Sequence, residues 1–96
     1  MRPALRSRLE QLAADYAKSE VDWERSLASR FGAVPLHADI GGCILLAPNG
    51  DWLFVHSDQD WTSTIEYSRD VSDEDKAVAL RTAGEKHPEL LALLDD

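Results

Sequence analysis

The sequence predicts a single α+β domain, with helices near both ends of the chain and a mainly antiparallel sheet of three to four strands between them. Toward the N-terminus, apolar residues recur at intervals of three, four and seven, which is the spacing of a helix with one buried face. In the middle of the chain, two short apolar runs flank an Asn-Gly pair, a strong local signal for a β-hairpin. At 96 residues, the chain allows one modest hydrophobic core and no second domain.

The first helical segment extends from Pro3 to about Arg30. Proline suits the first turn of a helix, and Gly32 suits the position just past its end. The apolar stripe weakens near Ser19, where Ser19 and Asp22 resemble a capping box. We therefore expect one long or kinked helix, with a break at Ser19 as the alternative. The stripe consists of Leu5, Leu9, Leu12, Tyr16, Trp23 and Leu27.

The central hairpin is expected at Asn49-Gly50, between apolar residues 44–47 and 52–56. Because successive side chains of a strand point to opposite faces, both faces of this hairpin are apolar. We therefore expect helices of the same chain, or a second chain, to cover them. A two-residue turn gives five cross-strand pairs: Ala47 with Trp52, Leu46 with Leu53, Leu45 with Phe54, Ile44 with Val55 and Cys43 with His56.

Two weaker extended segments complete the predicted sheet. Residues 33–37 form a short strand before the turn signal Gly41-Gly42. Residues 62–67 alternate in polarity, so that Ile65 and Tyr67 face inward and the polar residues face outward. We expect this last strand to be the half-solvated outer strand of the sheet.

The C-terminal region predicts one helix followed by a short final helix. Ser72 precedes three acidic residues, 73–75, and a helix N-terminus is stabilised both by a capping hydroxyl and by negative charge. The helix is expected to end at Gly84 or at His87-Pro88, because the residue before a proline disfavours the α conformation. Pro88 then begins the final, leucine-rich helix.

The charge of the chain is acidic and unevenly distributed, with a net value of −8. Residues 1–31 hold six bases and five acids, whereas residues 32–96 hold four bases and thirteen acids. Nucleic acids and anionic membranes are bound by clustered Lys and Arg, so we expect neither as a partner. An acidic surface attracts basic proteins instead; the alternative is that the acidity serves solubility alone.

The sequence has no motif typical of catalysis, and we expect no cofactor and no metal. His37, Cys43, His56 and His87 lack the close spacing of metal ligands. Cys43 lies in an apolar run, which is typical of a buried structural thiol, and its predicted pairing with His56 is the only basis for a thiolate enzyme. No uninterrupted apolar segment has the length of a membrane span or a signal peptide, so we expect a cytoplasmic protein.

The candidate functional residues are acids interleaved with tryptophans, in and around a region from Gly32 to Ser68 that contains no Lys or Arg. Aromatic side chains anchor protein interfaces, and complementary charge steers the encounter. The alternative for Trp61 is that it closes the open end of the sheet. The expected partner-binding surface consists of Asp51, Trp52, Asp58, Asp60, Trp61 and Glu66.

Three segments of the C-terminal half together resemble a known family: residues 42–53 (GCILLAPNGDWL), 76–80 (KAVAL) and 87–94 (HPELLALL). They are similar to SMI1/KNR4-type (SUKH) proteins. Many bacterial members of that family serve as immunity proteins that bind and neutralise toxins, often basic nucleases. The resemblance therefore implies non-catalytic inhibition of a toxin by an acidic surface.

These observations favour a non-catalytic protein-binding module of the immunity or inhibitor kind, as a monomer or a homodimer, with a basic protein as its partner. The doubly apolar hairpin also suits a second hypothesis, a small acidic dimeric chaperone for a secreted effector. A third hypothesis is an enzyme that uses Cys43 and His56.

Overall fold

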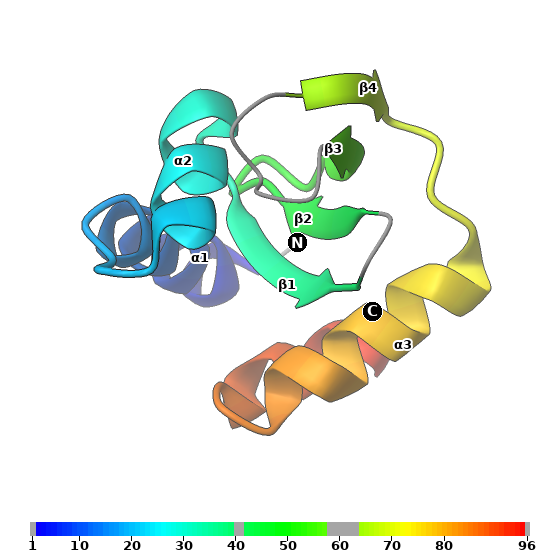
Figure 1. Ribbon diagram of the computed structural model, residues 1–96. Coiled ribbons are helices and arrows are strands. Elements are labelled where there is room, and N and C mark those ends of the chain that lie inside the picture. The colour runs from blue at the N-terminus through cyan, green and yellow to red at the C-terminus, as the bar shows by residue number, and fades with distance from the viewer. Residues whose placement is uncertain (1, 40–41, 58–63, 96) are drawn as a thin grey trace.

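The computed structural model describes residues 2–39, 42–57 and 64–95, and the chain folds as the α+β domain that the sequence predicts (Figure 1). The strands form one antiparallel sheet in the order β1-β2-β3-β4, so each strand pairs with its neighbour in the chain. The elements are α1 (Pro3–Tyr16), α2 (Asp22–Phe31), β1 (Val34–Ala38), β2 (Cys43–Leu46), β3 (Trp52–Ser57), β4 (Thr64–Ser68), α3 (Asp73–Gly84) and a final 3-10 helix, η1 (Pro88–Asp95).

The N-terminal segment is two helices, so the alternative of a break at Ser19 is the one the structure adopts. Ser19 Oγ accepts a hydrogen bond from the backbone N–H of Val21 (3.1 Å) and donates one to Glu24 (3.0 Å), which holds the turn between α1 and α2. The residue that caps α2 is Val21, not Ser19 as the capping-box pattern predicts. At the other end of α2, Gly32 has a φ of 60°, the left-handed conformation that favours glycine at a helix end.

The hairpin between β2 and β3 turns at Asn49-Gly50 as expected, but its register differs from the predicted one. The Gly50 N–H donates to the Ala47 carbonyl and the Ala47 N–H donates to the Asp51 carbonyl, each at 2.9 Å. Pro48, Asn49 and Gly50 therefore form a three-residue loop. Proline favours this loop because its fixed φ suits the second position of a type I turn, and Gly50 follows with a φ of 95°. The observed pairs are Leu46–Trp52, Leu45–Leu53, Ile44–Phe54 and Cys43–Val55.

A register shift of one residue changes which side chains share a face of the sheet. Trp52 packs on the same face as Leu46, whereas the two-residue turn places them on opposite faces. Cys43 pairs with Val55, so the predicted pairing of Cys43 with His56 is wrong.

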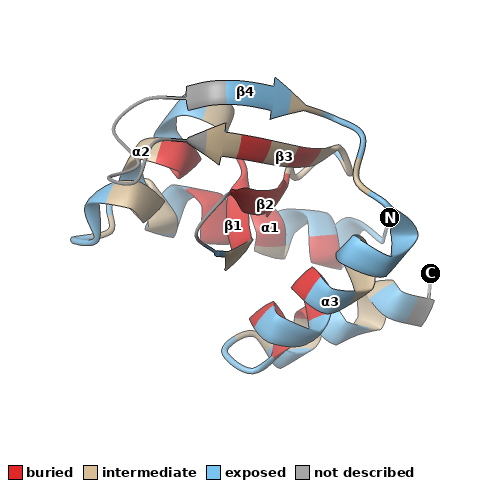
Figure 2. Cartoon of the chain, turned by 45° about the vertical axis from the view of Figure 1, so that its right-hand side comes forward, coloured by how far each residue is buried: buried red, intermediate tan, exposed pale blue. Residues whose placement is uncertain are grey.

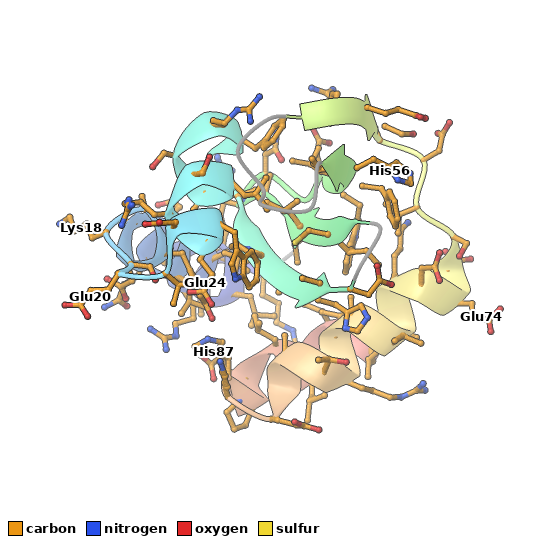
Figure 3. The ribbon with its side chains drawn as sticks, in the orientation of Figure 1. Lys18, Glu20, Glu24, His56, Glu74 and His87 are labelled. Carbon is orange, nitrogen blue, oxygen red and sulfur yellow. The ribbon has the colours of Figure 1, made fainter. Side chains whose placement is uncertain are left out.

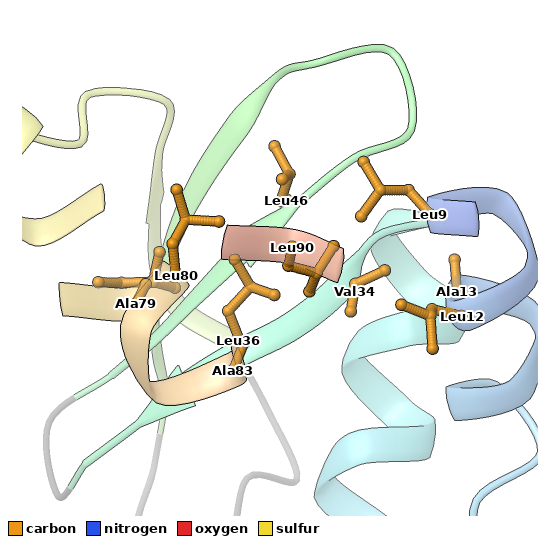
Figure 4. Packing of buried hydrophobic residues seen from close by; sticks show 11 residues of the cluster. Leu9, Leu12, Ala13, Val34, Leu36, Leu46, Ala79, Leu80, Ala83 and Leu90 are labelled. Atoms are coloured by element: carbon orange, nitrogen blue, oxygen red, sulfur yellow. The ribbon is translucent and has the colours of Figure 1, made fainter. Parts of the chain in front are cut away.

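Helices of the same chain cover both faces of the sheet, and the buried residues lie between these layers (Figures 1 and 2). α1, α3 and η1 pack on one face and α2 packs on the other. Figure 4 shows the first of these cores, in which Leu90 of η1 lies among side chains of β1, β2 and α1. The apolar faces of the hairpin are therefore satisfied within one chain. The first core contains Leu9, Leu12, Ala13, Val34, Leu36, Ile44, Leu46, Ala79, Leu80, Ala83 and Leu90, and the second contains Leu27, Ala33, Cys43, Leu45, Leu53 and Val55.

β4 is an outer strand of the sheet and pairs only with β3. The Tyr67 ring stacks on Phe31 of α2, with 5.3 Å between the ring centroids, yet Tyr67 remains 42% exposed. Tyr67 therefore faces α2 at the margin of that layer, not in its centre. The expected inward position of Ile65 lies outside the described side chains.

Both C-terminal helices begin where the sequence predicts, and α3 ends at the first of its two predicted positions. Ser72 Oγ accepts a hydrogen bond from the Asp75 N–H at 3.1 Å, which caps α3, and α3 ends at Gly84. Gly84 permits a close approach of η1, because a Cβ there would lie 2.5 Å from Leu91 Cδ2. Among the described residues, no helix combines the length and apolar character needed to cross a bilayer.

Candidate functional site: a groove around Trp52

Trp52, the first residue of β3, lies in a groove between the start of α3 and the end of η1. The groove has a volume of about 440 Å³, which is within the range of sites that accept a small molecule or a few side chains. We call it the Trp52 groove. It is lined by Trp52, Asp73, Lys76, Ala77, Leu80, Leu93 and Leu94.

The indole of Trp52 already carries a cation in this structure. Lys76 Nζ lies 5.9 Å from the centroid of the Trp52 ring and 3.8 Å from Asp73 Oδ1. A cation over an indole face is attracted by the ring quadrupole, with about 0.5–1 kcal/mol at an exposed site. The groove therefore has the two groups that hold an ammonium ion, an aromatic face and a carboxylate.

The rim of the Trp52 groove is acidic because α3 begins there. Asp73, Glu74 and Asp75 form the first turn of α3, and all three are exposed; Figure 3 shows Glu74 projecting from the start of this helix. Asp51 precedes Trp52 in the chain, and its Oδ2 lies 3.7 Å from Arg69 Nη1. Four carboxylates against two bases, Arg69 and Lys76, leave the rim with a net negative charge.

The structure describes three residues of the predicted surface, Asp51, Trp52 and Glu66, and it does not bring all three together. Asp51 and Trp52 lie together at the Trp52 groove. Glu66 is exposed on β4 and pairs across the sheet with His56 of β3. His56 comes five residues after Asp51, which places the two about 17 Å apart at the rise of a strand. The predicted contacts Asp58, Asp60 and Trp61 lie outside the described residues.

Sequence reasoning misses the residues that complete the groove. In the sequence, the acids of the first turn of α3 indicate only a helix start, and the leucines of η1 indicate only a short final helix. The signal for Lys76 is the i, i+3 spacing from Asp73, which permits an ion pair on one helix face. The packing of α3 and η1 beside Trp52 has no such local signal.

Cys43 is fully buried. Burial above all, and then the negative charges of Asp39 and Glu24, raise the pKa of its thiol to about 12. The thiol is therefore protonated at neutral pH, whereas a catalytic cysteine needs a lowered pKa. Because His56 is also not its cross-strand neighbour, the Cys43–His56 enzyme hypothesis has no geometric basis.

Fold and groove together define a small α+β domain with an acidic rim around an aromatic and aliphatic groove. Among the described residues, no group of three or more His, Cys, Asp or Glu side chains is placed to hold a metal ion. No protein-family model matches the chain, and no curated protein or solved structure matches it either. The resemblance to SMI1/KNR4-type proteins therefore depends on its three sequence segments alone.

Proposed function

We propose that this protein is a non-catalytic binding module of the immunity or inhibitor kind, which captures a basic protein partner in the cytoplasm through the Trp52 groove. The observation that carries the proposal is the position of Lys76, whose ammonium group rests over the Trp52 indole beside the Asp73 carboxylate. The groove binds its own lysine in the way in which it would bind a lysine or arginine of a partner.

Charge and apolar surface support the same partner chemistry. The net charge of −8 and the acidic rim would accelerate association with a basic protein. Inside the groove, the aliphatic stem of a partner's Lys or Arg would pack on Leu93 and Leu94 while its charged end displaces Lys76 from Trp52. The sequence resemblance to SMI1/KNR4-type proteins supports a partner of the toxin class.

The dimeric chaperone hypothesis has weaker support. It was motivated by a hairpin with two apolar faces, and the helices of the same chain cover both of them. A second copy of the chain is therefore not needed to bury this surface.

Affinity capture from the native host, with paired variants as bait, tests the proposal. The wild-type protein is expected to retain a basic protein, and retention is expected to weaken with rising salt. Asp73→Asn combined with Glu74→Gln should reduce the association rate several-fold and flatten its salt dependence, because both side chains are exposed on the rim.

The matched control is Glu10→Gln, which removes an exposed charge from α1. Capture of a basic protein equally well by the wild type, the rim variant and the control would contradict the assignment of the Trp52 groove. Retention of acidic proteins would contradict the proposed partner class.

A further inference from the structure

A second concave region lies on the opposite end of α3 from the Trp52 groove, between the N-terminal helices, β1 and the segment that follows α3. It consists of two hollows of about 190 and 290 Å³, and Tyr16, Glu24 and His87 line both. Figure 3 shows Glu24 and His87 on the two sides of this gap. We call the pair of hollows the Tyr16 cleft. Trp23 lines the smaller hollow, and Ser19 lines the larger one.

A hydrogen bond between two distant parts of the chain joins two residues that line both hollows. Tyr16 Oη and His87 Nε2 are 3.1 Å apart, and the two rings meet edge to face with 6.1 Å between centroids. This contact joins the end of α1 to the segment between α3 and η1. Tyr16 and His87 are therefore fixed in orientation before any ligand binds.

Glu24 supplies a negative charge that has no ion-pair partner among the described residues. Its carboxylate accepts a hydrogen bond from Ser19 Oγ at 3.0 Å, and in the described part of the chain no Lys, Arg or His group forms an ion pair with it. The Glu24 side chain is only partly exposed. The pKa of the Tyr16 hydroxyl is raised, first by the burial of Tyr16 and second by the negative charge of Glu24. A partly buried carboxylate is most stable when a cation accompanies it.

Other charged groups at the cleft do not supply that cation. Arg8 is engaged by Glu89 at 2.5 Å and by Gln11 at 3.2 Å. Asp15 adds a second negative charge to the larger hollow, and Glu85 balances the exposed Lys86 at the smaller one. The cleft therefore keeps a negative balance beside two aromatic side chains.

We propose that the Tyr16 cleft binds one organic cation, a guanidinium or alkylammonium group, with Glu24 as its counter-ion and with Tyr16 and Trp23 as its aromatic walls. Carboxylates and aromatic faces together are the groups that recognise such cations. Each hollow is smaller than the usual site for a drug-sized ligand, which fits a group no larger than one side chain. This site is independent of the Trp52 groove and of the function proposed for it.

Titration of the ¹⁵N-labelled protein with ethylguanidinium chloride, followed by NMR, tests this site. Saturable shifts are expected at the indole N–H of Trp23 and at the His87 ring, with a Kd on the order of 1–10 mM. The neutral analogue N-ethylurea, at matched ionic strength, should produce no saturable shift. Shifts of equal size with both compounds, or no saturation with ethylguanidinium, would overturn the proposal.

Matched variants identify the counter-ion. Glu24→Gln keeps a side chain that can accept the hydrogen bond from Ser19 and should weaken binding about 10-fold or more, since a charge-assisted contact is lost. Glu20→Gln, in the exposed turn between α1 and α2, should leave the Kd within about twofold. Glu24→Asp keeps the charge, so binding should persist if the Gln variant is unstable. Equal binding by the Glu24→Gln and Glu20→Gln variants would refute the role of Glu24.

A final comparison distinguishes two sources of the cation. N-acetyl-L-argininamide binds more tightly than ethylguanidinium if the cleft accepts an arginine side chain together with its backbone. Equal or weaker binding indicates a free small cation. Either result requires saturable binding at the Tyr16 cleft. If neither N-acetyl-L-argininamide nor ethylguanidinium saturates, the proposed site is refuted.

Discussion

Cys43 makes the stability of this protein sensitive to alkaline pH. Burial, helped by the charges of Asp39 and Glu24, raises the pKa of the folded-state thiol from 9.0 to about 12. In the unfolded chain the thiol ionises near 9, so at pH 10 it is mostly thiolate when unfolded and still protonated when folded. The stability that depends on this group is complete below the unfolded-state pKa and is lost as the pH rises from about 9 toward 12.

The size of the loss follows from the two pKa values. One pKa unit corresponds to 1.36 kcal/mol, and integration between pH 8 and pH 10, with values of 9.0 and about 12, gives a loss of about 1.4 kcal/mol in the free energy of unfolding. That is a large fraction of the stability of a small domain, which is typically about 5–15 kcal/mol.

Urea unfolding at pH 8 and pH 10, followed by far-UV circular dichroism under reducing conditions, measures this loss. The reference is Cys43→Ala, which removes the thiol; all other groups, including Tyr16 with its own raised pKa, titrate in both proteins. The wild type should lose about 1.4 kcal/mol more than the variant between the two pH values. Equal losses would refute the attribution to a buried thiol.

Three further predictions concern stability, measured by chemical denaturation. Gly84→Ala places a Cβ 2.5 Å from Leu91 Cδ2 and 2.6 Å from its Cγ. The destabilisation by overpacking, about 1–3 kcal/mol, should exceed a helix-propensity gain of at most about 1 kcal/mol. Adding Leu91→Ala to the same chain should relieve the overpacking, and no relief would exclude this clash as the cause. Gly32→Ala meets no atom within 4 Å but must adopt a φ of 60°, which should cost about 1–2 kcal/mol; an unchanged midpoint would show that the helix end rearranges. Ser72→Ala should cost about 1 kcal/mol through loss of the N-cap bond to Asp75, whereas Ser72→Asp should retain most of the stability; equal losses in both would argue against a capping role.

The parts of the fold that sequence reasoning predicts are those set by neighbouring residues. The N-cap at Ser72, the helix end at Gly32 and the position of the hairpin turn depend on a few adjacent side chains. The hairpin register is not determined by the Asn-Gly pair, because Asn49-Gly50 fits both a two-residue turn and a longer loop. Pro48 favours the longer loop, whereas the predicted pairing follows from the Asn-Gly pair alone.

The site is less predictable than the fold because it depends on contacts between distant segments. Trp52 faces α3 because of the hairpin register, and the leucines of η1 reach it only after η1 packs along α3. The Tyr16–His87 hydrogen bond joins residues 71 positions apart, and no spacing rule predicts it. Composition predicts that the surface as a whole is acidic, but not that acids gather at the start of α3.

The first and last helices share one hydrophobic core, and this has a consequence for biosynthesis. Leu9 of α1 and Leu90 of η1 are both fully buried in that core, and Arg8 pairs with Glu89 beside them. A nascent chain that has emerged only as far as α3 lacks Leu90, so the core that α1, α3 and η1 share on this face of the sheet stays incomplete. We therefore expect folding of the domain to finish only after residue 90 has left the ribosome, and a chain that stops short of it to expose part of this core to quality-control proteases.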